Sequence, residues 1–132
     1  MFVDRLSQAQ RQALLDLAVI MAGIDNDVSA EELQYLEELA SNYNLTLDLE
    51  NHGANSIDDL ISIVDSKQAK VIVLQELIKL SYKDGHFGPE EQQKVFQIAQ
   101  KLGLNDPELL LAIERWVRQG FDWLHEGEQL LG

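Results

Sequence analysis

Two acidic stretches contain the side chains best suited to chemistry in this sequence. The first covers residues 25–32 (DNDVSAEE) and the second covers residues 84–91 (DGHFGPEE). Hard divalent cations such as Ca²⁺ and Mg²⁺ prefer oxygen ligands, which carboxylates supply. The two stretches therefore form a candidate Ca²⁺ or Mg²⁺ site. Its candidate ligands are Asp25, Asp27, Glu31 and Glu32 from the first stretch, and Asp84, Glu90 and Glu91 from the second.

The first stretch begins like a calcium-binding EF-hand loop, but neither stretch completes one. An EF-hand needs a bidentate glutamate at its twelfth position and a glycine at its sixth. Counted from the first aspartate of each stretch, the twelfth positions hold Leu36 and Val95, and the sixth positions hold Ala30 and Pro89. A standard EF-hand is therefore excluded, and a looser acidic site remains.

The same carboxylates also have a purely structural interpretation. Ser29 and Glu32 have the spacing of a capping box, in which each side chain bonds to the backbone amide of the other residue. Glu91 falls in the corresponding first turn of a later helix, where the helix dipole favours a negative charge. Capping alone and capping combined with cation binding are both open on the sequence.

Residue patterns that usually carry catalysis are missing. The chain has no cysteine, and no serine lies in a Gly-x-Ser-x-Gly turn. No glycine-rich loop matches a phosphate-binding motif. His52, His86 and His125 are too widely spaced for a helical metal-binding pair, so we expect them at the surface. The sequence predicts a protein that is not an enzyme.

Composition narrows the range of partners. The 132 residues carry a formal charge of −13, and 45% of them are hydrophobic. So acidic a surface repels phosphate backbones, and we expect a protein partner rather than nucleic acid. The longest apolar runs, such as residues 71–74, are far shorter than the ~20 residues that cross a bilayer. The first residues show no secretion signal. We expect a cytoplasmic protein without a membrane span.

Apolar residues recur at three- and four-residue steps along most of the chain, which predicts six or seven helices and no sheet. Ser29 and Pro89 are expected to start helices, and Gly103 is expected to end one as a left-handed cap. The segment over residues 67–82 is apolar nearly all round and is predicted to be a central helix. Gly120 is expected to separate a sixth helix from a short last one.

The chain contains an internal repeat, in which residues 10–46 align with residues 69–105. Among the aligned pairs are Leu14 with Val73, Ala18 with Leu77, Asp25 with Asp84, Glu32 with Glu91, and Ala40 with Ala99. Each copy is a helix, a loop and a helix, and neither copy can bury its apolar stripe alone. We therefore predict an all-α bundle in which the two copies pack with pseudo-twofold symmetry.

A short motif follows the apolar helix of the second copy. It consists of residues 83–87 (KDGHF), then Glu90 and Glu91, and then a helix ending in residues 99–104 (AQKLGL). In these features the chain resembles the TerB-like tellurite-resistance family, and the resemblance covers most of residues 10–105. The first copy departs from the motif, with residues 22–27 (AGIDND) where an Asp-Gly pair would be typical.

The resemblance implies one small all-helical domain over residues 1–132, built from two similar halves. It also implies a non-enzymatic binding module associated with stress resistance, whose acidic loop residues interact with metal ions.

Aromatic residues near the carboxyl end provide an alternative function. Trp116, Phe121, Trp123 and Leu124 could form an apolar surface, and aromatic residues are over-represented at the energetic centres of interfaces. The alternative is a purely structural protein–protein adaptor that uses this surface and binds no ion. Trp116 keeps step with the apolar residues before it and is predicted to lie in the core. For Trp123, covering the end of the bundle is the simpler prediction, although it is the better candidate for exposure.

Overall fold

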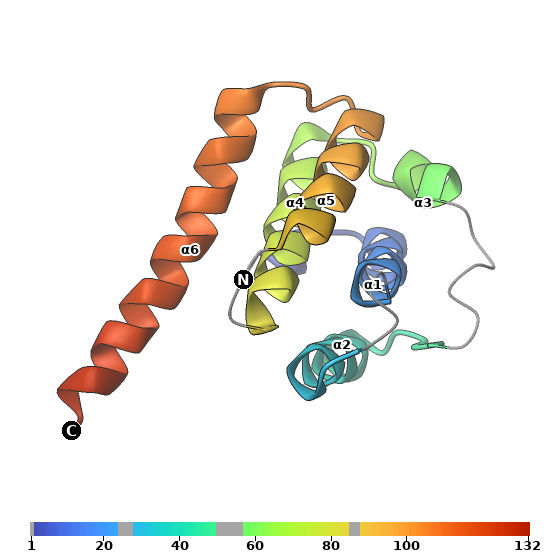
Figure 1. Ribbon diagram of the computed structural model, residues 1–132. Helices are drawn as coiled ribbons and strands as arrows, with labels where there is room; N and C mark the ends of the chain where they lie inside the picture. Colours follow the sequence, from blue (N-terminus) through green and yellow to red (C-terminus); the bar gives the residue numbers. More distant parts are fainter. Residues whose placement is uncertain (1, 24–27, 50–56, 85–87) are drawn as a thin grey trace.

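The computed structural model describes every residue except 1, 24–27, 50–56 and 85–87 (Figure 1). Within the described residues there are six α-helices, two 3-10 turns and no strand. The predicted all-α class is confirmed. The helices are α1 (Gln8–Ala22), α2 (Ala30–Tyr43), α3 (Ile57–Ile63), α4 (Lys67–Ser81), α5 (Pro89–Lys101) and α6 (Pro107–Leu130), and the turns are η1 (Val3–Arg5) and η2 (Tyr82–Asp84). Of the helices in the described part of the chain, none is long and apolar enough to cross a membrane.

The helix α4 lies at the centre of the bundle, as predicted. It contacts α1, α2, α5 and α6, which approach it from different sides (Figure 1). Its buried residues therefore cover most of the helix rather than one stripe, and Val71, Gln75 and Lys79 on the remaining face are half-buried. The other helices are positioned by their contacts with α4.

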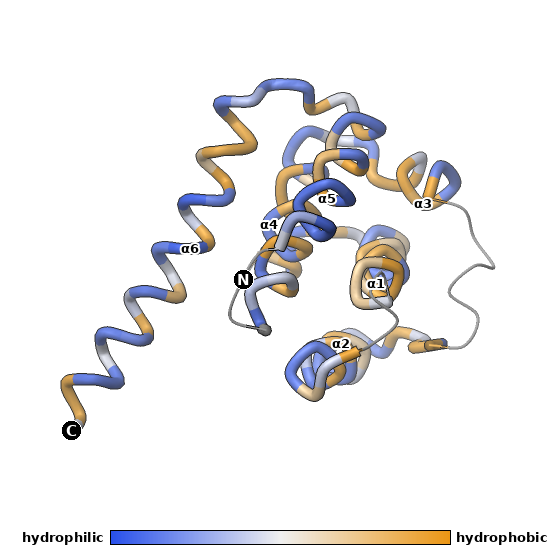
Figure 2. The backbone as a smooth tube through the Cα atoms, viewed as in Figure 1, coloured by the Kyte–Doolittle hydropathy of each residue, from blue (hydrophilic) through white to orange (hydrophobic). Residues whose placement is uncertain are grey.

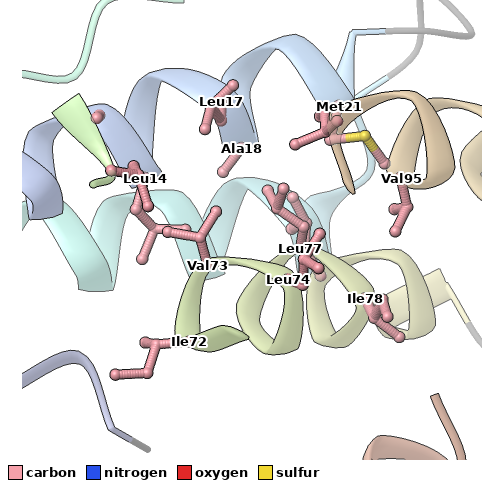
Figure 3. Close-up of a cluster of buried hydrophobic side chains, with 14 of the residues drawn as sticks. Leu14, Leu17, Ala18, Met21, Ile72, Val73, Leu74, Leu77, Ile78 and Val95 are labelled. Atoms are coloured by element: carbon pink, nitrogen blue, oxygen red, sulfur yellow. The ribbon is translucent and has the colours of Figure 1, made fainter. Parts of the chain in front are cut away.

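The core is formed where α1 crosses α4 (Figure 3). Leu14 and Leu17 of α1 face Val73, Leu74 and Leu77 of α4, and all five side chains are fully buried. Fully burying one such side chain contributes roughly 1.5–3 kcal/mol to stability. This packing fixes the rotation of α4 about its axis, and so it determines which face of α4 remains available to α6.

Most helix ends follow the local signals in the sequence. The Ser29 hydroxyl accepts a hydrogen bond from the Glu32 amide at 3.0 Å, which starts α2, and Pro89 occupies the first turn of α5. Gly103 adopts the left-handed conformation predicted for it, with φ of 82°. A second capping box, which was not predicted, joins Ser7 and Gln10 at the start of α1.

The segment between α2 and α3 is a connector, as far as the structure describes it. Leu45 and Leu47 are half-buried and pack against the core, so they provide the apolar anchors that the sequence predicted there. The remainder of this connector, residues 50–56, lies outside the described residues.

The prediction that Gly120 separates two helices is wrong. The helix α6 continues without interruption from Pro107 to Leu130 and projects beyond the rest of the bundle (Figure 1). It begins at Asp106, whose carboxylate accepts a hydrogen bond from the Glu108 amide at 3.0 Å. One interior glycine costs a helix only about 1 kcal/mol relative to alanine, which is too little to end a helix already established on both sides.

Candidate functional site

The structure assigns different surroundings to the predicted cation ligands. Asp25, Asp27 and the side chain of Asp84 lie outside the described residues. Glu31 and Glu90 are exposed in the first turns of α2 and α5. The described residues contain no group of three acidic or histidine side chains that could hold a metal ion. The Ca²⁺ or Mg²⁺ site therefore stays a prediction.

Two of these glutamates are less exposed to solvent than Glu31 and Glu90. Glu91 is half-buried in the first turn of α5. Glu32 is buried, and its Oε1 accepts a hydrogen bond from the Ser29 amide at 3.1 Å. Together with the bond from the Glu32 amide to the Ser29 hydroxyl, this completes the capping box. The structural interpretation thus holds for Glu32.

Of the three histidines, only His125 belongs to the described residues. It is exposed on α6, as predicted, and its Nε2 atom lies 3.2 Å from the side-chain nitrogen of Gln129. His52 and His86 lie outside the described part of the chain.

A buried polar pair joins α2 to α4, and the sequence analysis missed it. The Tyr35 hydroxyl donates a hydrogen bond to Glu76 Oε1 at 2.8 Å, and both side chains are buried. Burial raises the pKa of Tyr35 well above its usual value, and the negative charge of Glu76 raises it further. Lys79 Nζ lies 3.8 Å from the same Glu76 oxygen. Nothing in the local sequence indicates this pairing, because Tyr35 and Glu76 belong to different halves of the chain.

A groove with a volume of about 630 Å³ opens between the carboxyl-terminal part of α4 and the middle of α6. This volume falls within the ~300–1,000 Å³ that is usual for binding sites. The α4 side contributes Glu76 and Lys79, followed by Lys83 of η2. The α6 side contributes both tryptophans of the chain among its lining residues, which include Trp116, Val117, Phe121, Trp123 and Leu124.

The α6 wall of the groove belongs to one apolar stripe that repeats every seven residues. Hydrophobic residues recur at intervals along α6 in Figure 2. A seven-residue spacing keeps side chains on one face of a helix, as in a coiled coil. The centre of the stripe alternates between two series, which are Leu110, Val117, Leu124 and Leu131, and Ile113, Gly120 and Gly127. A flanking series consists of Leu109, Trp116, Trp123 and Leu130.

This stripe is covered at one end and bare at the other. In the proximal segment (residues 107–117), Ile113 and Val117 are each 5% exposed, because α4 packs against them. In the distal segment (residues 118–131), Trp123 is 72% exposed and Leu124 is 57% exposed. Leu130 and Leu131 are exposed too. The distal segment therefore presents a large apolar face to solvent, which is unusual unless a partner covers it.

Aromatic contacts and one short hydrogen bond hold α6 against the bundle beside the groove. The Tyr82 hydroxyl donates to Glu114 Oε1 at 2.6 Å, and the Tyr82 ring lies 5.7 Å from the Phe121 ring, centre to centre. Partial burial raises the pKa of Tyr82 to about 12, and the hydrogen bond to Glu114 also stabilises the neutral phenol. On the other side, the Phe2 and Trp116 rings stack with their centres 6.0 Å apart.

Two lysines place positive charge along the α4 side of the groove. Lys83 Nζ lies 6.0 Å from the centre of the Phe121 ring, and Lys79 Nζ lies 5.9 Å from the Tyr35 ring. The chain carries 23 acidic and only 10 basic side chains, so two lysines beside one groove give it a different character from the rest of the surface. Lys79 is paired with Glu76 in the same wall, so the positive charge at this edge comes from Lys83. Apolar walls with this charge beside them suit a partner that is apolar on one face and acidic beside it.

The predictions for the two tryptophans are wrong. Trp116 was expected in the core but is 42% exposed, and Trp123 does not cover the end of the bundle. The reason is the continuity of α6, since a helix that does not end at Gly120 carries Trp123 past the bundle instead of folding back onto it. The seven-residue spacing of Trp116 and Trp123, repeated by Gly120 and Gly127, is the sequence signal that indicates one helix with one face.

Within its described residues the protein is all-helical and has an open groove with largely apolar walls. Comparisons of the chain with protein-family models, with curated proteins and with solved structures gave no match. The groove itself offers apolar area, aromatic rings and two lysine side chains.

Proposed function

We propose that the protein is a non-enzymatic interaction module that binds an amphipathic helix of a protein partner in the groove between α4 and α6. The observation that carries the proposal is the bare apolar face of the distal segment, with Trp123 72% exposed beside the groove. Of the two functions predicted from the sequence, this is the adaptor that uses the carboxyl-terminal aromatic surface. The acidic loops enter the proposal as helix caps, the role that Glu32 plays.

A helix is the partner that best suits the shape of this surface. Helix-in-groove recognition uses apolar side chains at three- and four-residue steps, which match a stripe with the same steps on the receiving side. The stripe of α6 provides such steps, and Gly120 and Gly127 leave hollows in it into which partner side chains can fit. Trp116 and Trp123 supply the large aromatic area that usually dominates binding energy.

We further propose that the fold is TerB-like, with two similar halves related by a pseudo-twofold axis. Two aligned pairs of the internal repeat support this proposal. Leu14 aligns with Val73 and Ala18 aligns with Leu77, and these residues occupy the facing sides of α1 and α4 in the core (Figure 3). Equivalent residues meet in this way when two copies pack about a twofold axis. A role in tellurite or other stress resistance rests on the family resemblance alone.

Selection of peptides from a displayed library of helical sequences tests the proposed function. We expect the full chain to select amphipathic helices with acidic residues beside their apolar face. Their binding should weaken about 10- to 30-fold in Trp123→Ala, which is the usual effect of removing an energetically central aromatic. Leu111→Ala is the matched control, because Leu111 is 62% exposed on the same helix but lies off the stripe. Peptides that bind Trp123→Ala as tightly as the unaltered chain would refute the proposal.

A further inference from the structure

We propose that the helix that covers the distal end of the groove, and the bare stripe beyond it, is the distal segment of a second copy of this chain, paired antiparallel with the first. This inference rests on the proposed function of the groove and names its partner. The pairing is isologous, because the same surface of each copy contacts the other. It places the two bundles at opposite ends of a short two-helix contact, since each distal segment projects away from its own bundle (Figure 1).

The region that can pair is set by burial. Ile113 and Val117 are already covered by α4, so a second helix can cover only the stripe beyond them. Antiparallel helices pair the two central series of a seven-residue repeat with one another. Within the distal segment, this places Leu124 opposite Gly127 of the second copy and Leu131 opposite Gly120 of the second copy. Every glycine of the distal stripe then faces a leucine.

The glycines are explained by this arrangement and not by the packing of a single chain. A Cβ atom added at Gly120 or at Gly127 would meet nothing within 4 Å among the residues that the structure describes. Glycine is a poor helix former, and an interior glycine that no contact requires weakens the helix. An opposing leucine gives both glycines a steric role, because the leucine occupies the space that a side chain would take.

Charge complementarity favours the same register. With Leu124 opposite Gly127, the positions that flank the two central series also pair between the copies. Phe121 then lies beside Glu128 of the second copy, and Trp123 lies beside Leu130 of the second copy. Lys83 Nζ lies 6.0 Å from the Phe121 ring, so the incoming Glu128 carboxylate approaches an ammonium group. A parallel pair would instead place each glycine opposite a glycine, which leaves both without a steric role.

The apolar area available to such a contact lies on the distal stripe, where the exposed fractions of Trp123, Leu124, Leu130 and Leu131 are 72%, 57%, 88% and 87%. The formal charge of −13 on each copy opposes association, so we expect a dissociation constant on the order of 10 µM rather than a permanent dimer.

Sedimentation of the full chain over a concentration series from about 1 µM to about 200 µM tests the self-association. We expect a reversible shift from monomer to dimer. Leu124→Glu should weaken the dimer at least about tenfold, because it places a carboxylate in the centre of the contact. Leu111→Glu is the matched control and should leave the dimer unchanged, since Leu111 is similarly exposed but off the stripe. A monomer throughout the series, or equal effects of the two substitutions, would overturn the inference.

Disulfide formation tests the direction and register, because the chain has no cysteine of its own. A mixture of Gly120→Cys and Leu131→Cys proteins should form mixed disulfides, while each protein alone should not. In the proposed pair these two positions face each other, whereas like positions lie about 16 Å apart along the helices, too far for a disulfide. Rapid disulfide formation by Gly120→Cys alone would indicate a parallel pair and would overturn the register.

The outcomes for the inference and for the proposed function are separable. If selected peptides bind in a Trp123-dependent manner but the chain sediments as a monomer, the second copy is rejected as the partner and the interaction module is retained. If selected peptides bind without regard to Trp123 and the chain is a monomer, both are rejected.

Discussion

The two segments of α6 have the same residue pattern and opposite surroundings. The proximal segment buries Ile113 and Val117 against α4, whereas the distal segment continues the stripe with Leu124 and Leu131 facing solvent. The pattern alone therefore does not determine burial. What determines it is whether a second helix lies alongside, and among the described residues no helix lies against the distal stripe. The proposed function depends on this distal stripe, which the described residues leave uncovered.

The largest contrast between the segments should appear in stability. Ile113→Ala removes a buried side chain and leaves a cavity, so it should lower the free energy of unfolding by about 3 kcal/mol. Leu124→Ala, in the exposed segment, should change it by less than about 0.5 kcal/mol at concentrations where the chain is a monomer. Urea denaturation measures both. Equal losses would mean that the distal stripe is covered by the chain itself.

A smaller effect is expected at the contact that holds the proximal segment to the end of α4. Tyr82→Phe removes the hydroxyl that donates to Glu114, and it should cost about 1–1.5 kcal/mol because the acceptor is a carboxylate. The pKa of Tyr82 is about 12 in the folded protein and 10.0 as an ordinary phenol. The folded state thus holds this proton more tightly, and its stabilisation is complete below pH 10 and is lost as the pH rises towards 12.

The matching measurement is the difference in melting temperature between the unaltered chain and Tyr82→Phe. This difference should be constant from neutral pH to about pH 10 and should shrink above it. Taking a difference matters because Tyr35, whose pKa is also raised, destabilises both proteins equally at high pH. A difference that stays constant to pH 12 would show that Tyr82 does not depend on its proton for this contact.

The smallest effect concerns the glycines of the distal segment. Gly120→Ala should strengthen the helix locally by about 1 kcal/mol, because the added methyl group meets nothing within 4 Å in the chain. In the monomer, amide hydrogen exchange of the neighbouring residues should slow about fivefold, while exchange in the proximal segment should not change. Faster exchange after this substitution would indicate that Gly120 is needed for a conformation of the chain itself.

Local signals predicted much of this fold from the sequence. The capping box of Ser29, the first-turn proline at position 89 and the left-handed Gly103 depend on residues within one turn of each other. The enclosed helix α4 was predictable because its apolar residues occur on every side. Each of these features follows from the chemistry of a few neighbouring residues.

The features that the sequence analysis missed depend on distant residues or on small energies. The Tyr35–Glu76 hydrogen bond joins residues of different halves, and no local pattern connects them. Gly120 resembles a helix-ending glycine, but the helical hydrogen bonds on either side of it outweigh its low helix propensity, and α6 continues. A break at Gly120 would place Trp123 on a separate helix over the end of the bundle, and the α6 side of the groove would not form. The seven-residue stripe was present in the sequence and would have corrected the predictions for Gly120 and Trp123.

Hydrogen exchange of the full chain at about 5 µM and at about 200 µM compares the two segments most directly. The central claim is that a second helix covers the distal stripe. It predicts that amides of residues 118–131 exchange several-fold more slowly at the higher concentration, and that amides of residues 107–117 exchange at the same rate in both. It also predicts that a selected helical peptide slows the distal amides at low concentration. Distal amides that exchange equally fast at both concentrations and with the peptide present would contradict the claim.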